Sequence, residues 1–171
     1  MKNLSNNEPH VLVLGIGNVL MGDEGVGVYV ARRLEVASLP ENVQVLDGGT
    51  GSFLLLGAMQ EAGQVVLIDA TIDGNLPGTL RRLTPRFSSD YPATLTAHDI
   101  GLKDLLDAAY LTGQLLDVTL FTISIATPQG VGMELSPAIT GHIEEITERI
   151  RKDVARIAGQ FRAEHAQVCH A

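Results

Sequence analysis

The sequence predicts an α/β fold: a three-layer α/β/α sandwich built around a twisted, mainly parallel sheet of five strands. Short apolar runs of strand length alternate along the chain with segments whose apolar residues recur at helical spacing. Such alternation produces a parallel sheet with helices on both faces, because the crossovers are right-handed. Aromatic residues make up only 4% of the chain and Trp is absent. Val, Ile and Leu must therefore fill the core, as they do in buried parallel sheets.

The five expected strands differ in pattern. Residues 11–14 and 65–68 are uninterrupted apolar runs, which indicates burial on both faces, and Asp69 closes the second of these two. Residues 43–46 form a short strand that the glycine-rich segment 47–51 closes. The fourth carries Arg81 and Arg82, which indicates an edge strand. The fifth alternates apolar residues with Thr and Ser. In chain order, the expected strands are residues 11–14, 43–46, 65–68, 79–83 and 118–126.

The first helix is expected directly after the first strand, with Asp23 as its cap. Its buried face is formed by apolar residues at helical spacing, so that it can pack on the sheet. That face consists of Val26, Tyr29, Val30 and Leu34. The other segments expected before the last strand are a short, largely buried helix at 53–61, an irregular stretch at 85–96, and a helix at 100–110 capped by Asp99.

The C-terminal part is expected to be one long amphipathic helix. Ser136 and Pro137 supply a cap and a first-turn proline. Apolar residues then recur at spacings of three and four as far as Phe161. Residues 162–171 are expected to form a flexible tail. A length of 171 residues favours a single domain, 1–171, with a core of about residues 10–160.

Composition excludes several classes of protein. A net charge of −8 argues against nucleic acid and against an anionic membrane surface as partners. Cys169 is the single cysteine, so an internal disulfide framework is impossible and a reducing compartment fits. The polar N-terminus does not resemble a signal peptide, and no apolar run approaches the ~18 residues that a membrane span needs. We therefore expect a cytoplasmic protein.

Three residues form a candidate metal site. Ligands of open α/β sheets bind beyond the carboxyl ends of the strands, where the strand order reverses. If the order begins with the second, first and third strands, Glu24 and Asp69 flank that point, and His98 lies in a later loop long enough to reach it. Two carboxylates and one imidazole suit Zn, Ni, Fe(II) or Mn and leave coordination positions open. Each residue also has a structural interpretation: Glu24 as a solvated acid at a helix N-terminus, Asp69 as a turn cap, and His98 as a surface residue.

Two glycine-rich segments follow strands. The first, residues 15–22, has Leu20 where the third glycine of a dinucleotide-binding motif belongs, so we expect its glycines to allow a tight turn and close backbone packing. The second, residues 47–51, is either a strand-to-helix turn or a floor for a peptide substrate formed by Gly48, Gly49 and Thr50. Neither an H-E-x-x-H nor a G-x-S-x-G motif occurs.

Five segments in order resemble the hydrogenase maturation peptidases. They cover the chain from residue 11 to about residue 150. One such segment would be a weak signal, whereas five in register are specific. The segments are Val13-Leu-Gly-Ile-Gly-Asn-Val-Leu-Met-Gly-Asp-Glu-Gly-Val-Gly27, Asp47-Gly-Gly-Thr-Gly51, Ile68-Asp-Ala70, His98-Asp-Ile-Gly-Leu102 and Glu134-Leu-Ser-Pro137.

The resemblance implies an activity and a ligand set. Members of this family make one cut that removes a C-terminal extension from the precursor of the large subunit of a nickel–iron hydrogenase, after nickel insertion. The resemblance also implies that Glu24, Asp69 and His98 engage a divalent metal, which we expect to be nickel carried by the substrate. Asp69 is in addition a candidate general base. Many members have Gln after the motif histidine, whereas this chain has Asp99. Two other functions stay open: a metal-dependent peptidase with another protein substrate, and a nickel-sensing hydrogenase chaperone that does not cut.

Overall fold

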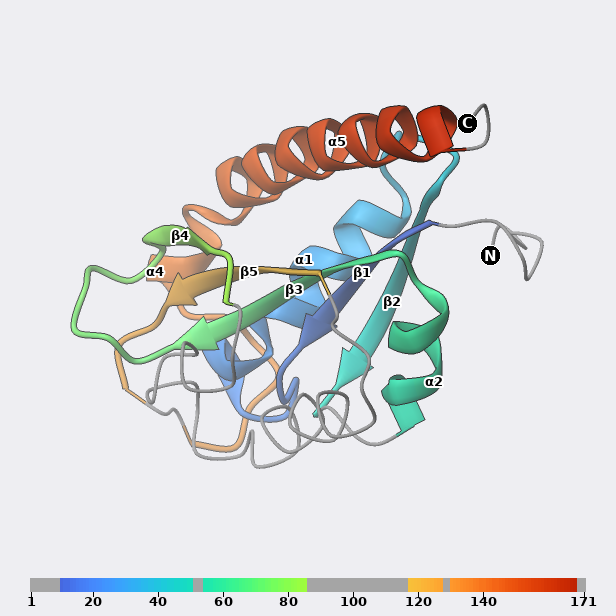
Figure 1. Cartoon of the computed structure of the whole chain (residues 1–171). Coiled ribbons are helices and arrows are strands. Elements are labelled where there is room, and N and C mark those ends of the chain that lie inside the picture. The colour runs from blue at the N-terminus through green and yellow to red at the C-terminus, as the bar shows by residue number, and fades with distance from the viewer. Residues whose placement is uncertain (1–9, 51–53, 86–116, 128–129, 169–171) are drawn as a thin grey trace.

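A single five-stranded sheet organises the chain (Figure 1). The computed structural model describes residues 10–50, 54–85, 117–127 and 130–168. The strand order is β2-β1-β3-β5-β4; β2, β1, β3 and β5 run parallel, and β4 pairs antiparallel with β5 at the edge. The predicted mainly parallel sheet and its edge strand are confirmed. The strands are β1 (Val11–Ile16), β2 (Val43–Gly49), β3 (Gln64–Thr71), β4 (Leu80–Leu83) and β5 (Val118–Ser124).

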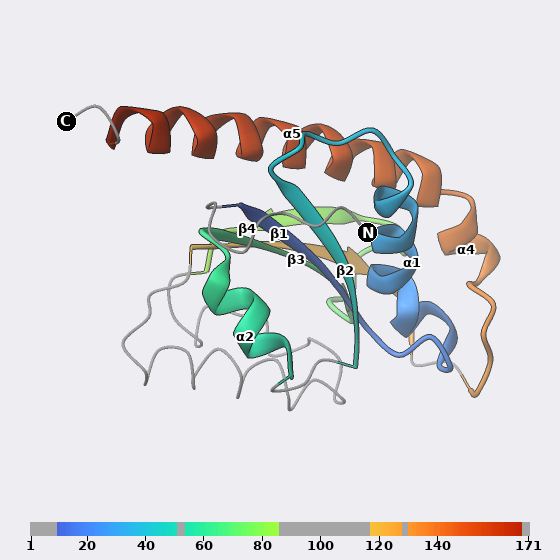
Figure 2. The ribbon, with the colours of Figure 1, turned by 90° about the vertical axis from the view of Figure 1, so that its right-hand side faces the viewer.

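Helices cover both faces of the sheet, which confirms the three predicted layers. Figure 2 shows α1 and α5 on one side of the strands and α2 on the other. Within the described residues, no helix has both the length and the apolar character needed to cross a bilayer. The helical segments are the 3₁₀ turn η1 (Gly22–Gly25) and the helices α1 (Val26–Glu35), α2 (Leu54–Glu61), α4 (Pro137–Thr140) and α5 (Ile143–Val168).

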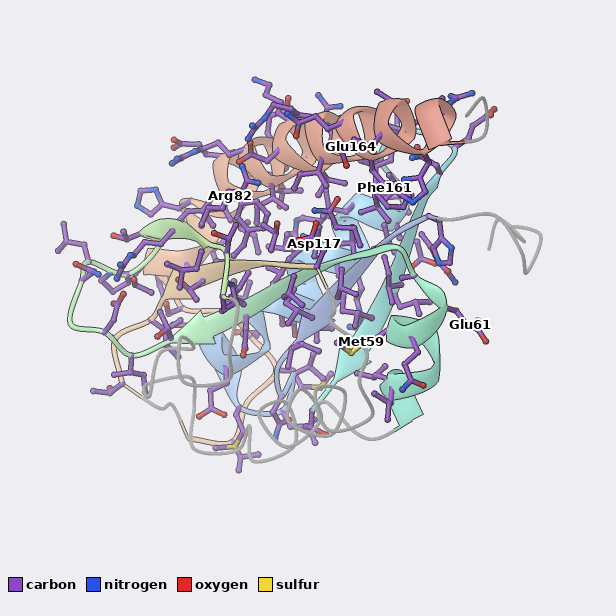
Figure 3. The ribbon with its side chains drawn as sticks, in the orientation of Figure 1. Met59, Glu61, Arg82, Asp117, Phe161 and Glu164 are labelled. Atoms are coloured by element: carbon purple, nitrogen blue, oxygen red, sulfur yellow. The ribbon has the colours of Figure 1, made fainter. Side chains whose placement is uncertain are left out.

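The core divides into two clusters, one on each face of the sheet, because successive side chains of a strand point to opposite faces. Val26, Val30 and Leu34 of α1 are fully buried in the larger cluster, as their spacing predicted, and Tyr29 is partly buried beside them. The smaller cluster lies under α2. Figure 3 shows Met59 of α2 directed toward the strands and Glu61 directed away. The helix α2 is less buried than predicted, since Met59 is its only described side chain that is fully buried.

The C-terminal helix differs from its prediction at both ends. Ser136 caps α4 as expected, since its Oγ accepts the N–H of Ile139 at 3.3 Å. The helix then breaks at Gly141, a poor helix former, and α5 begins two residues later. The tail predicted to be flexible from residue 162 is helical to Val168. The ring of Phe161 (Figure 3) packs over Gly63, and its centroid lies 4.0 Å from the centroid of the His165 ring. These contacts anchor the C-terminal end of α5.

The strand order reverses between β1 and β3. The chain passes from β1 to β2 on one side, and the later strands β3 and β5 lie on the other. This is the order assumed from the sequence. The last residue pair between β1 and β3 is Gly15 with Ile68, while Ile16 already pairs with Gly49 of β2 after an irregularity in register. A crevice at the carboxyl ends of β1 and β3 is therefore the expected ligand position.

Glycines let α1 begin directly on top of this point. A Cβ at Gly27 would lie 2.2 Å from the carbonyl oxygen of Ile68 and 2.3 Å from that of Ile16. A Cβ at Gly17, whose φ is +139°, would lie 2.0 Å from the carbonyl oxygen of Glu24. Side chains at these positions would force backbones apart, so the interpretation of the first glycine segment as a close-packing device is confirmed.

Gly27→Ala should lower the free energy of unfolding by about 3 kcal/mol, because the added methyl group overlaps two backbone carbonyls that cannot move independently. Gly159→Ala is the matched control. Gly159 is exposed in the middle of α5 with open space around its Cβ position, so alanine should raise stability by about 0.5–1 kcal/mol. Urea denaturation measures both. Equal stability of Gly27→Ala and the wild type would show that the close approach is not a constraint.

Candidate functional site

Glu24 is a buried carboxylate in η1, the turn that joins β1 to α1. The residue is 2% exposed. Its Oε2 atom is enclosed by protein and has no hydrogen-bond partner among the described residues. The interpretation of Glu24 as a solvated acid at a helix N-terminus is therefore wrong. A buried carboxylate oxygen without a donor is costly unless a cation or another donor meets it.

Asp69 lies within β3 rather than at its end. The sequence predicted that it closes the strand, but β3 continues to Thr71, with Asp69 opposite Thr122 of β5. The strand is longer because β5 continues to pair with it after β1 has left the sheet. Asp69 is fully buried, and its Oδ1 accepts the N–H of Ala70 at 2.7 Å. Its position is one residue beyond the last pair between β1 and β3.

The backbone places Glu24 and Asp69 near the same switch point of the sheet. Gly27 contacts the carbonyls of Ile16 and Ile68; Glu24 lies three residues before Gly27, and Asp69 directly follows Ile68. The predicted convergence of the two carboxylates on one ion stays a prediction. His98 and Asp99 lie outside the described residues. Within residues 10–50, 54–85, 117–127 and 130–168, no cluster of three His, Cys, Asp or Glu side chains is placed to hold a metal, so the three-ligand set stays a prediction.

Asp23 was predicted to cap α1, and this prediction is wrong. Its carboxylate is 2% exposed, and Oδ1 accepts the backbone N–H of Ser136 at 2.7 Å. The two residues are 113 positions apart, and no local pattern in the sequence indicates this bond. Gly25 stands at the N-cap position of α1 instead, without a side-chain cap.

The second glycine segment packs against the first. The N–H of Gly17 donates to the carbonyl oxygen of Gly49 at 2.7 Å. Asp47 accepts the N–H of Gly49 at 3.0 Å and forms an ion pair with Arg32 of α1 at 2.8 Å. Gly48 and Gly49 are half-buried, whereas Thr50 is exposed at the edge of the described segment. The role of Gly48, Gly49 and Thr50 as a peptide floor stays a prediction, and the backbone groups of Gly49 already have partners inside the protein.

Glu24→Gln should raise the free energy of unfolding of the metal-free protein by about 1 kcal/mol, because an amide costs less to bury than an unpaired carboxylate. Glu164→Gln, at an exposed position on α5 (Figure 3), should change it by no more than about 0.5 kcal/mol. Urea denaturation with a chelator present measures both. A large loss of stability in Glu24→Gln would show instead that the protein itself supplies a donor to this carboxylate.

Several known proteins similar to this chain are named for hydrogenase maturation or formation. Residues 28–153 match the hydrogenase maturation proteases. The hydrogenase expression/formation protein HupD of Rhodobacter capsulatus is 40% identical over 150 residues, which cover 83% of this chain and 70% of that protein. The hydrogenase 2 maturation protease of Escherichia coli is 34% identical over 146 residues, which cover 82% of this chain and 87% of that protein.

Solved structures agree with these sequence matches. The hydrogenase maturating endopeptidase HybD from E. coli superposes with a TM-score of 0.73 at 33% identity, covering 82% of this chain and 89% of that chain. The hydrogenase maturation protease HybD from Thermococcus kodakarensis superposes with a TM-score of 0.69 at 28% identity, covering 85% and 99%. The resemblance found in the sequence motifs is confirmed: the chain belongs to the hydrogenase maturation protease family.

Proposed function

We propose that this protein is the endopeptidase that removes the C-terminal extension from the precursor of a nickel–iron hydrogenase large subunit after nickel insertion, and that it recognises the loaded precursor through the metal. Membership of the hydrogenase maturation protease family supports the reaction and the kind of partner. The observation that carries the metal-dependent part is the Oε2 atom of Glu24, which is buried without a hydrogen-bond partner among the described residues.

The donor set fits a divalent cation. A carboxylate oxygen that is removed from water and meets no donor destabilises the folded protein, and a bound cation offsets that cost. Glu24 and Asp69 are both buried at the end of the sheet where this fold class binds ligands. With the imidazole of His98 as the third ligand, the set matches the preference of nickel and zinc for nitrogen and oxygen donors.

Each residue has a defined role in this proposal. Glu24, Asp69 and His98 engage nickel already lodged in the precursor, so that an unloaded precursor docks poorly. The ion, when bound, polarises the scissile carbonyl. Asp69 takes the proton of the attacking water as general base. Gly48, Gly49 and Thr50 line the path of the extension as it reaches the crevice.

Asp69→Asn and His98→Ala should each slow removal of the extension by about 10²-fold or more, because each removes a group that engages the nickel, and Asp69→Asn also removes the general base. The measurement is intact mass of the large subunit co-expressed with each variant. Asp117→Asn is the matched control. Asp117 is exposed and directly precedes β5 (Figure 3), so it lies at the amino-terminal ends of β3 and β5, away from the proposed site, and this variant should trim normally. Normal trimming by both Asp69→Asn and His98→Ala would remove the metal trio from the site.

Cleavage should depend on the metal content of the precursor. Purified wild-type protein mixed with nickel-loaded precursor should shorten it, while nickel-free precursor should keep its full mass over the same time, because the carboxylates lack the cation that completes the docking surface. Reagents that label serine or cysteine nucleophiles should leave the rate unchanged. Equal cleavage of loaded and unloaded precursor would refute recognition through the ion, and binding of the loaded precursor without any cleavage would identify a chaperone.

A further inference from the structure

We propose that Asp23 is a positioning residue for Glu24: its carboxylate ties the η1 turn to residues 130–136, and this tie holds the neighbouring carboxylate toward the crevice. Residues 130–136 are called the support segment below. The inference rests on the proposed function for its effect on cleavage, although the tie itself is a property of the free protein. Asp23 touches no reacting atom and acts through Glu24.

The support segment is bonded to residues that directly precede Glu24. The N–H of Gly132 donates to the carbonyl oxygen of Leu20 at 2.8 Å, and the N–H of Gly22 donates to the carbonyl oxygen of Gly132 at 2.7 Å. These bonds form a short parallel bridge between Met21 and Gly132. The N–H of Ser136 completes the set by donating to Asp23 Oδ1 at 2.7 Å.

A further bond fixes the support segment to α1. The hydroxyl group of Tyr29 donates to the carbonyl oxygen of Met133. The segment is therefore joined to the chain before Glu24, to the residue next to it, and to the helix after it. Its far end is also anchored, because Ser136 caps α4 and Ile139 of α4 is fully buried in the core.

The η1 turn needs such support. It has only four residues, and its N-cap position, Met21, makes no side-chain cap bond. A 3₁₀ turn has poorer hydrogen-bond geometry than an α-helix, so its own bonds define its orientation weakly. A hydrogen bond to a buried carboxylate is stronger than one between neutral groups. Asp23 thus supplies a strong constraint one residue before Glu24.

Small errors in the position of Glu24 should matter for catalysis. Groups that act on a substrate need placement within about 0.5 Å, and that placement depends on the residues that support them. Loss of a supporting hydrogen bond at a metal-binding group commonly costs about 10–100-fold in activity or metal affinity. We expect a cost of that size when the tie between Asp23 and Ser136 is broken.

Hydrogen exchange on the free protein tests the tie without reference to function. Asp23→Ala should speed amide exchange in both residues 22–25 and the support segment, whereas Asp23→Asn should change it little, since its side-chain oxygen still accepts the N–H of Ser136. Ser136→Pro removes the donor at a residue whose φ of −59° proline can adopt, and it should act like Asp23→Ala. Ser136→Ala is its control, because alanine loses the cap of α4 but keeps the N–H. Unchanged exchange in Asp23→Ala and Ser136→Pro would overturn the inference.

Trimming of the nickel-loaded precursor tests the consequence. Asp23→Ala and Ser136→Pro should lower kcat about 10–100-fold with KM changed less than about threefold, while Asp23→Asn and Ser136→Ala should stay within about threefold of the wild type. Equal loss in Asp23→Ala and Asp23→Asn, or equal loss in Ser136→Pro and Ser136→Ala, would overturn the positioning role. If the wild type does not trim the precursor, the proposed function fails, and the exchange experiment alone decides whether the tie exists.

Discussion

The approach of Gly27 to the carbonyl oxygens of Ile16 and Ile68 is the constraint on which the site depends. It brings the first turn of α1 onto the point where β1 and β3 separate, closer than any residue with a side chain would allow. Glu24 precedes that contact by three residues, and Asp69 follows Ile68 directly. One backbone contact thus places both acidic residues near the switch point, and the larger core cluster between α1, α5 and the sheet keeps the contact in place.

Burial of these acids works against stability and therefore points to function. The strands beneath them are filled with Val, Leu and Ile that are fully excluded from water, and nothing in such a core requires a charge. Sites where a protein departs from the rules of stable packing are commonly sites of chemistry. Our proposal of a cation carried by the substrate supplies a physical reason for this departure.

Much of the fold follows from local patterns, and the errors have physical causes. Apolar runs and cap residues predicted the strands, the buried face of α1 and the cap at Ser136, whereas the strand order was assumed from common doubly wound folds. The predicted end of β3 was wrong because pairing with β5 prolongs the strand beyond Asp69. This pairing depends on the tertiary structure and leaves no local pattern in the sequence. Asp23 was assigned as a cap because its partner, the N–H of Ser136, lies 113 residues away. The assumed strand order predicted that Glu24 and Asp69 lie near the switch point, whereas His98 and Asp99 lie outside the described residues.

An anomalous-diffraction experiment on crystals grown with Ni²⁺ tests the central claim most directly. The account predicts one strong peak at the carboxyl ends of β1 and β3, coordinated by carboxylate oxygens of both Glu24 and Asp69, with His98 as a further ligand. A peak elsewhere on the protein would contradict it. So would a density map in which a protein group already donates a hydrogen bond to Glu24 Oε2, or in which the two carboxylates lie too far apart to share one ion.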